Sequence, residues 1–314
     1  MTNSDRDNQP PPLGRQLPDR GEPSLRDSIG DPFFFVIGAP RCATTSLFAW
    51  FDQHSEVFAP KVKEPHYFSH PEVSDTYYNA RLISDLDEYS NLFTDRPAGM
   101  LAGEFSSSYL FRSDSAQRIA EVSPHAKIVA VLRNPVERAV SHYRLDVREG
   151  YTTERLQTLL ATSFPDQRFR REYVDVGCYS KSIEKWEQVF PSEQMHFIFY
   201  DDLVADWDKT TGELSDFLEI STSPNNAPPH INESTGPRRP AAKALRTVLP
   251  MRWVADRLPP TVRGSLIRKL STDAAEVDPQ AIEVLHRLFD EEITALEAKF
   301  GRDLSHWRYD GVSI

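Results

Sequence analysis

Residue types that could do chemistry first meet in the segment Lys63-Glu64-Pro65-His66, where a carboxylate and an imidazole stand at alternate positions. In an extended segment, alternate side chains point to the same side, so Glu64 and His66 would share one face. Such a pair could take the proton from a hydroxyl group. Without further context, the segment is more typical of an exposed charged loop ahead of an aromatic strand at Tyr67-Phe68.

A second candidate group combines hydroxyl groups with a fixed positive charge. The segment Gly38-Ala39-Pro40-Arg41-Cys42-Ala43-Thr44-Thr45-Ser46 follows an apolar run and leads into a helix pattern. A tight turn into a helix start presents free backbone N–H groups and the positive end of the helix dipole, and both attract anions. The three hydroxyls and the Arg41 guanidinium add donors and charge. The alternative is a polar turn whose hydroxyls cap the helix.

A second positive charge follows another apolar run. Arg133 comes directly after residues 127–132, and Ser141 lies further along the helix pattern that follows Asn134-Pro135. Ligands of α/β proteins bind at the carboxyl ends of the strands, so Arg133 and Ser141 could hold a second phosphate. An arginine that pairs with a surface carboxylate at a strand end explains the same residues equally well.

Regular elements must position these candidates, and hydrophobic patterns predict them. Continuous apolar runs predict buried strands at 33–37, 127–132 and 196–200, with a weaker strand at 103–105. Helices are predicted at 44–51 and 136–143, and from the N-cap Asp278 to Gly301. The alternation of strands and helices predicts an α/β fold, with a P-loop-like central parallel sheet flanked by helices on both faces.

Composition also divides the chain. Residues 1–30 contain almost no large apolar side chain, so they cannot bury enough surface to offset the entropy of ordering, and we expect a disordered tail. Residues 31–314 are expected to form a single domain. Within it, the proline-rich stretch 221–240 predicts a long irregular loop, and such loops often carry function.

Charge and cysteine content exclude several classes of protein. The chain has 36 basic and 47 acidic residues, a net charge of −11, which disfavours nucleic-acid binding. Its two cysteines, Cys42 and Cys178, make neither a disulfide framework nor a zinc cluster and fit a reducing compartment. The N-terminus lacks a secretory pattern, and the longest apolar stretch, 33–37, is too short to span a bilayer. We therefore expect a cytoplasmic protein without a transmembrane segment.

Taken in order, the motifs resemble those of sulfotransferases that use 3′-phosphoadenosine-5′-phosphosulfate (PAPS). The resemblance is to the branch shared by bacterial enzymes and the glycosaminoglycan-modifying Golgi enzymes. The matching segments are Gly38 to Ser46, Lys63 to Phe68, Gly103 to Leu110, Ile128 to Arg144, Gly177 to Tyr179 with Trp186, Tyr200 to Leu203, Asn232 to Ser234, and Gly301 to Leu304 with Trp307. Each motif is short, but together their order and spacing are typical of the family.

The resemblance implies a co-substrate and roles for particular residues. The chain would transfer a sulfuryl group in line from PAPS to an acceptor hydroxyl, in preference to an amine. Glu64 would be the general base, with a pKa raised by burial; His66 would orient the acceptor or serve as the base instead, and Arg41 would neutralise the leaving phosphate. The expected PAPS-binding residues are Arg41, Cys42, Ala43, Thr44, Thr45, Ser46, Arg133, Ser141, Tyr179, Gly236, Arg238 and Arg239, and no metal ligands are expected.

Two departures from the family pattern bear on the site. The family often has lysine where this chain has Arg41, which keeps the charge but is bulkier and a poor proton donor. The glycosaminoglycan enzymes carry a lysine near the position of Phe105. Its absence disfavours a heparan-like acceptor and favours a less charged small molecule, lipid or sugar. The sequence carries no signal for the oligomeric state.

Two other functions remain open for the same segments. A Walker loop places Gly-Lys-Ser/Thr at the helix start, whereas this chain has Ala43-Thr44-Thr45 and lacks the lysine that reaches the ATP phosphates. An ATP-dependent P-loop-type kinase would need that lysine and magnesium. A non-catalytic nucleotide-binding protein of the same fold would show damaged motifs, whereas Glu64, Arg41 and Arg133 are all present.

Overall fold

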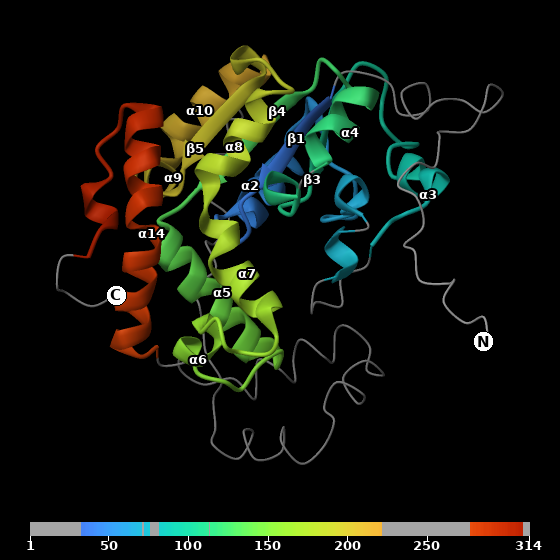
Figure 1. Ribbon diagram of the computed structural model, residues 1–314. Helices are drawn as coiled ribbons and strands as arrows, with labels where there is room; N and C mark the ends of the chain where they lie inside the picture. Colours follow the sequence, from blue (N-terminus) through green and yellow to red (C-terminus); the bar gives the residue numbers. More distant parts are fainter. Residues whose placement is uncertain (1–32, 71, 76–81, 113, 222–276, 310–314) are drawn as a thin grey trace, which may run out of the picture.

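A five-stranded parallel sheet forms the centre of the computed structural model, which describes residues 33–70, 72–75, 82–112, 114–221 and 277–309 (Figure 1). The strands are β1 (Phe33–Gly38), β2 (Val57–Phe58), β3 (Leu101–Phe105), β4 (Lys127–Leu132) and β5 (Met195–Phe199). They lie in the order β2-β3-β1-β4-β5, and every neighbouring pair is parallel. The predicted α/β class with a central parallel sheet is therefore confirmed.

Helices connect the strands and cover both faces of the sheet. They are α2 (Thr44–Phe51), α3 (Leu86–Asn91), α4 (Ser115–Val122), α5 (Pro135–Glu149), α6 (Leu156–Leu160), α7 (Gln167–Tyr173), α8 (Tyr179–Glu187), α9 (Tyr200–Ala205), α10 (Trp207–Leu218) and α14 (Pro279–Phe300). In Figure 1, α4 and α8 lie in front of the sheet, and α10 lies behind it. From β1, helix α2 leads towards the β2 edge of the sheet, whereas α4 and α8 lie in connections that lead towards the β5 edge. Because such crossovers are right-handed, α2 lies on the face opposite α4 and α8.

The side chains of β1 are buried on both faces, as its continuous apolar sequence predicts. Phe34 points towards α2, where its ring lies 4.7 Å from that of Phe51. Phe33 and Phe35 point the other way, with ring centroids 5.0 Å from Phe93 and 5.8 Å from Phe68. Because strand side chains alternate, each face receives aromatic groups and the strand has no solvent side.

Most predicted elements are present, with some changes at their ends. The strands expected at 33–37, 103–105, 127–132 and 196–200 are β1, β3, β4 and β5, although Tyr200 opens α9 instead of ending β5. Strand β2 was missed because it is too short to form a pattern. The helix expected at 136–143 continues as α5 to Glu149, where Gly150 ends it with a left-handed backbone (φ 79°). The suggestion of an aromatic strand at Tyr67-Phe68 was wrong, because Tyr67–Ser69 forms a 3-10 helix, η1.

Some expectations fall outside the described residues. These include the tail at 1–30 and almost all of the loop at 221–240. In the part of the chain that the structure describes, no helix is long and apolar enough to cross a membrane.

Gly103 gives a direct test of packing between β3 and β1. A Cβ at this position would lie 2.3 Å from Cζ of Phe34, inside the aromatic layer under α2. We predict that Gly103→Ala lowers the free energy of unfolding by about 1–3 kcal/mol, because the packed ring has no room to move. Urea denaturation measures this change.

The matched control for this test is Gly212→Ala. A Cβ at Gly212, inside α10, meets no atom within 4 Å. This substitution should stabilise the protein by up to about 1 kcal/mol through helix propensity. Equal effects of the two alanines would contradict the packing that we describe at Gly103.

Candidate active site

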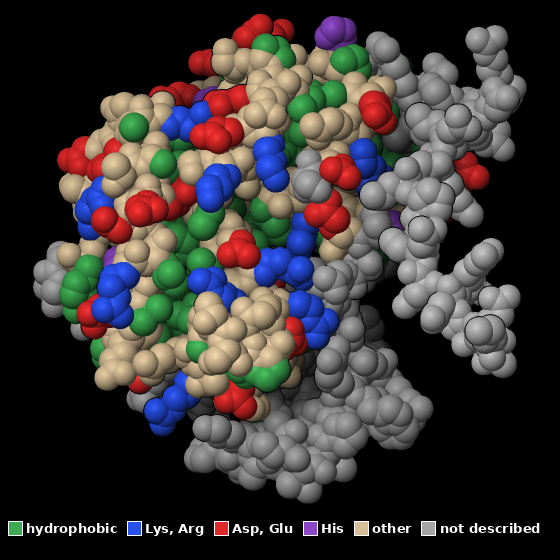
Figure 2. Space-filling view, viewed as in Figure 1, with side chains coloured by type: hydrophobic (Ala, Val, Ile, Leu, Met, Phe, Trp, Pro, Cys, Tyr) green, Lys and Arg blue, Asp and Glu red, His purple; other side chains and the backbone are tan. Residues whose placement is uncertain are grey.

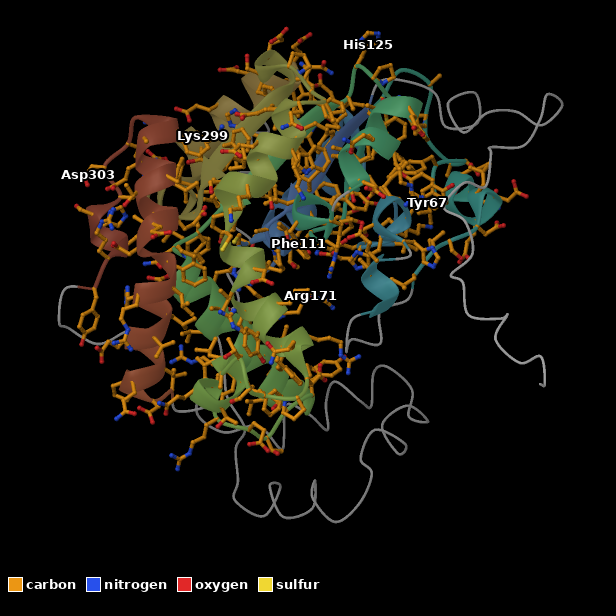
Figure 3. The ribbon with its side chains drawn as sticks, viewed as in Figure 1. Tyr67, Phe111, His125, Arg171, Lys299 and Asp303 are labelled. Atoms are coloured by element: carbon orange, nitrogen blue, oxygen red, sulfur yellow. The ribbon has the colours of Figure 1, made fainter. Side chains whose placement is uncertain are left out.

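The candidate residues follow the carboxyl ends of neighbouring strands in the sheet: Glu64 and His66 come after β2, the loop with Arg41 after β1, and Arg133 after β4. Strand β1 lies between β3 and β4, so the segments after these strands meet at one edge of the sheet. After β1 comes the loop to α2, after β3 the serine run 106–108, and after β4 Arg133. In Figure 3 the labels Tyr67, Phe111 and Arg171 mark η1, the 3-10 helix η3 (Tyr109–Phe111) and α7 around this edge. This is the edge at which α/β sheets bind ligands.

The loop after β1 has the backbone shape of an anion site. Arg41 (φ 72°) and Ala43 (φ 62°) both have left-handed backbones, which turn successive N–H groups towards one side. Ala43 is the N-cap of α2 and makes no side-chain cap hydrogen bond. The N–H groups of Thr44 and Thr45 lie in the first turn, where a helix provides no acceptor. An anion placed here would complete the helix start.

Arg41 connects this loop to the segment that follows β4. Its Nε donates to Oγ of Ser141, at 3.1 Å, although the two residues are 100 positions apart. Arg133 in turn donates from Nη1 to the carbonyl oxygen of Arg41, at 3.3 Å. Arg41, Ser141 and Arg133, three of the residues expected to contact the phosphates of PAPS, therefore lie in one connected cluster.

The positive charges in this cluster are close enough to disfavour one another. Burial, together with the charges of Arg148 and Arg133, lowers the pKa of Arg41 from its ordinary value. Figure 2, which is viewed as in Figure 1, shows Lys and Arg side chains gathered near the middle of this face of the molecule. A bound anion would relieve this repulsion, so the cluster has the electrostatics of an anion site.

Arg133 already has a carboxylate partner. Its Nε and Nη2 donate to Oε2 of Glu137, at 3.1 and 2.8 Å, and its guanidinium lies 4.4 Å from the centre of the Tyr200 ring. Burial acts to lower the pKa of Arg133, but the hydrogen bond and the charge of Glu137, with smaller contributions from Tyr200 and Cys42, together outweigh it and raise the pKa. The surface ion pair that the sequence left open is therefore present, and a phosphate would have to share or displace Glu137.

Glu64 and His66 lie side by side. Nε2 of His66 is 3.5 Å from Oε2 of Glu64, and Nδ1 is 2.7 Å from Oγ of Ser108. The segment is not extended, because Glu64 (φ 59°) and His66 (φ 56°) both have left-handed backbones. The two side chains meet through this tight backbone, and the expectation that they share a strand face was wrong in its geometry.

The Glu64 carboxylate is held by several donors. Ser107 donates its N–H to Oε2, at 3.0 Å, and its hydroxyl lies within 2.9–3.0 Å of both oxygens. Lys63 donates to Oε1 at 2.8 Å. Burial acts to raise the pKa of Glu64, but Lys63, His66 and the hydrogen bonds outweigh it and lower the pKa from its ordinary value. The expectation of a raised pKa at Glu64 was therefore wrong.

His66 lies in a different environment from Glu64. Burial lowers its pKa from the ordinary value, although the Glu64 charge acts in the opposite direction. At neutral pH the imidazole is therefore neutral and has one nitrogen able to accept a proton. The carboxylate and the neutral imidazole are the two candidate bases at this edge of the sheet.

The serine run 106–108 was not among the predicted site residues. Ser107 and Ser108 bind the side chains of Glu64 and His66, and Ser106 Oγ accepts the backbone N–H of His66 at 3.0 Å. Three hydroxyls directly after a buried strand could have indicated site residues, because ligands bind at the carboxyl ends of parallel strands. The contacts themselves join segments about forty residues apart and leave no local pattern.

Several other predicted residues lie at the loop but face inwards. Cys42 is fully buried; its N–H donates to Ala39 O at 3.3 Å, and burial raises the pKa of its thiol to about 11. The side chains of Thr44 and Ser46 are also buried, whereas Thr45 is exposed. An anion would therefore meet the backbone of Ala43 to Thr45 more readily than Cys42.

Tyr179 lies behind Arg133. Its side chain is 1% exposed, and its hydroxyl donates to the carbonyl oxygen of Arg133 at 3.0 Å. It thus supports the backbone that carries the guanidinium. The predicted residues Gly236, Arg238 and Arg239 lie outside the described part of the chain.

Phe105 explains one departure in the sequence. Its side chain is 2% exposed and packs edge-on against Phe34 and Phe48, with centroids 5.7 and 5.1 Å apart. It therefore belongs to the aromatic layer beneath α2 and gives the site no charge. Among the described residues, no group of three or more His, Cys, Asp or Glu side chains is placed to hold a metal ion.

The fold and this edge define an α/β protein whose loop after β1 has the backbone shape of an anion site, with a carboxylate–imidazole pair at the same edge of the sheet. A family model described as the sulfotransferase domain matches residues 31–236. The match covers more than half of the chain, so the chain belongs to the sulfotransferase family. The family resemblance inferred from the motifs is confirmed.

Individual relatives extend this result. Human heparan sulfate glucosamine 3-O-sulfotransferase 3A1 is 27% identical over 236 residues, which cover 72% of this chain and 52% of the relative. A Drosophila melanogaster bifunctional heparan sulfate N-deacetylase/N-sulfotransferase is 26% identical over 211 residues, 60% of this chain and 20% of the relative. The chain thus spans about half the length of the 3-O-sulfotransferase that it matches.

A solved structure resembles this one over most of its length. The crystal structure of a sulfotransferase from Alicyclobacillus acidocaldarius matches with a TM-score of 0.67 and 28% identity, covering 90% of this chain and all of the other.

Glu104, on β3 next to the site, should leave a signature in the pH dependence of stability. Burial raises its pKa from 4.5 to about 7. The folded protein then binds more protons than the unfolded chain, so the Glu104 contribution to stability falls as the pH rises from about 4.5 to about 7. We predict that Glu104→Gln gains stability relative to the native chain across this window, on the order of 1–3 kcal/mol.

Glu64→Gln is the matched control, since the pKa of Glu64 is lowered. Its native carboxylate stabilises the fold above the ordinary carboxyl pKa and loses this effect as the pH falls. Urea denaturation over a pH series measures the stability of each variant relative to the native chain. This difference should rise with pH for Glu104→Gln and fall with pH for Glu64→Gln. A pH-independent difference for Glu104→Gln would contradict the raised pKa.

Proposed function

We propose that this chain transfers a sulfuryl group from PAPS to a hydroxyl group of a small-molecule, lipid or sugar acceptor. The observation that carries the proposal is that two groups lie at the same carboxyl edge of the sheet: the cluster of Arg41, Ser141 and Arg133, and the Glu64–His66 pair bound to the end of β3. Membership of the sulfotransferase family supports it.

The residues at the edge of the sheet suit the chemistry of PAPS. PAPS carries a sulfated 5′-phosphate and a separate 3′-phosphate, and when bound it supplies the sulfuryl group. The N–H groups at the start of α2 and the Arg41 guanidinium would hold the 5′ end. Arg133 and Ser141 would hold the 3′-phosphate. Burial, together with repulsion from Arg148 and Arg133, lowers the Arg41 pKa, and a bound anion would offset both effects.

In this proposal Glu64 accepts the proton of the acceptor hydroxyl. Its lowered pKa keeps it ionised at neutral pH, and Ser107 and Lys63 fix its orientation. Neutral His66, at 3.5 Å, would orient the hydroxyl or serve as the base instead. Arg41 would balance the charge that develops on the leaving phosphate.

An acceptor with little charge fits this site best. The aromatic Phe105 stands near the position where the glycosaminoglycan enzymes have a lysine, and it lies in the core. We therefore do not extend to this chain the heparan sulfate acceptor in the names of its relatives. A cytoplasmic location, suggested by two free cysteines, is part of the proposal.

The rival function is phosphoryl transfer from ATP. Helix α2 begins at Thr44 after Ala43, and this start lacks the lysine that a Walker loop supplies. The proposal is tested by measuring release of 3′-phosphoadenosine-5′-phosphate (PAP) from PAPS across a panel of hydroxylated acceptors. Thermal shift with PAP and with magnesium ATP separates the two nucleotides. Stabilisation by ATP alone, without PAP release, would refute the proposal.

Glu64→Gln removes the proposed base and keeps the shape of the side chain. We predict a fall in kcat of about 10²–10⁴-fold with an unchanged Kd for PAP, because the proton transfer is lost while the phosphate contacts remain. His66→Asn is the comparison variant. If it abolishes turnover while Glu64→Gln retains nearly full kcat, the base is His66.

Arg133 and Glu137 should have opposite effects on the affinity for PAP. Arg133→Ala removes charge-assisted hydrogen bonds and should raise the Kd about 10–100-fold. Glu137→Gln frees Arg133 from its partner and should lower the Kd about two- to fivefold. Titration calorimetry measures both values.

Arg287→Ala serves as the control for lost positive charge. Arg287 lies on α14, where its side chain is exposed and pairs with Glu283 four positions before it. Its Kd should stay at the native value. An equal rise of the Kd for PAP in Arg133→Ala and Arg287→Ala would show that the affinity depends on net charge alone and would contradict a direct contact of Arg133 with the phosphate.

A further inference from the structure

Glu104 is a buried carboxyl group that the proposed reaction does not use. It lies on β3, its side chain is fully buried, and its backbone partner on β1 is Phe35. Tyr109 donates its hydroxyl to Oε2 at 2.6 Å, and the Tyr89 hydroxyl lies 3.4 Å from the same oxygen. Within the described part of the chain, Oε1 has no hydrogen-bond partner. Such a group lowers stability, so its place beside the site calls for a physical explanation.

The Tyr109 hydroxyl links Glu104 to the segment that carries Glu64 and His66. The backbone N–H of Phe68 donates to this hydroxyl at 3.3 Å. Phe68 lies in η1, the single turn that begins directly after His66. Tyr109 thus accepts from Phe68 on one side and donates to Glu104 on the other.

The direction of these two bonds depends on the carboxylate. An ionised carboxylate can only accept, so the Tyr109 hydroxyl must point its hydrogen towards Glu104 and its lone pairs towards Phe68. Ser106 also faces this carboxyl and acts to lower its pKa, while its Oγ accepts the N–H of His66 at 3.0 Å. The backbone N–H groups of His66 and Phe68 therefore meet acceptors that lie beside Glu104.

We propose that Glu104 is a positioning residue, which holds the Glu64–His66 pair in place through Tyr109 and Ser106. The inference rests on the proposed function, since the pair is the proposed proton acceptor. Its predicted structural effect can be measured without any turnover.

The ionisation state of Glu104 would then regulate the site. Burial raises its pKa to about 7, while Tyr109, Ser106 and Tyr89 act to lower it and the Glu64 charge acts to raise it. Around the same carboxyl group, Tyr67 stacks on Tyr89, and Arg118 lies over the Tyr67 and Phe68 rings. Glu64 and His66 both have lowered pKa values, so an activity limb near pH 7 would come from Glu104.

Three variants separate positioning from simple stability. Glu104→Gln removes the charge and adds a donor, and Tyr109→Phe removes the linking hydroxyl. Tyr89→Phe is the matched control, because its hydroxyl contacts Glu104 and not the Glu64–His66 segment. Hydrogen–deuterium exchange of the peptide 63–70 should be faster in Glu104→Gln and Tyr109→Phe, and native in Tyr89→Phe.

Activity gives the second readout. Glu104→Gln and Tyr109→Phe should lower kcat about ten- to a hundredfold with an unchanged Kd for PAP, because misplacement of the base affects only the chemical step. The acid limb near pH 7 should disappear in Glu104→Gln. Tyr89→Phe should keep the native kcat, and its limb should persist at a somewhat higher pH, because the Tyr89 hydroxyl acts to lower the Glu104 pKa.

The two readouts distinguish the inference from the proposed function. Native exchange of peptide 63–70 in both Glu104→Gln and Tyr109→Phe would overturn the positioning role, as would equal effects in Tyr89→Phe. If the native chain releases no PAP with any acceptor, the proposed function fails, but faster exchange in the two linking variants alone would still support positioning. The second linking variant decides the matter if the first does not fold.

Discussion

The parallel pairing of β3, β1 and β4 is the constraint on which the rest of the structure depends. Because the three strands run the same way, the segments that follow them reach one edge of the sheet. The strands are held there by aromatic side chains on both faces of β1. A shift of β1 would separate Arg41 from Ser141.

The site at this edge is a balance between charges of opposite sign. Arginines gather around the loop after β1, and the charges of Arg148 and Arg133 act with burial to lower the pKa of Arg41. On the other side of the edge lie the carboxylates of Glu64 and Glu104, whose pKa values are shifted in opposite directions. The cause of this difference is the partners: Glu64 has an ammonium group and a backbone N–H, whereas Glu104 has hydroxyls and a dry surrounding.

Hydroxyl groups give the site its order. Ser107 fixes the carboxylate of Glu64, Ser108 binds the imidazole of His66, and Tyr109 accepts the N–H of Phe68. These groups follow one another along the chain after β3, so the short segment 107–109 holds the segment from Glu64 to Phe68 in place. Rigid support of this kind is what a proton acceptor needs, because small displacements slow proton transfer strongly.

The sequence by itself determined the buried strands, the loop after β1, the helix start at Thr44 and the family, because each of these is encoded by neighbouring residues. It also located Glu64, His66, Arg41, Arg133 and Ser141. Only the tertiary structure decided that Arg41 meets Ser141, that Arg133 pairs with Glu137, that Ser107 holds Glu64, and that the pKa of Glu64 is lowered. The physical reason is that a pKa and a side-chain contact depend on groups from distant segments, whose positions local patterns do not record.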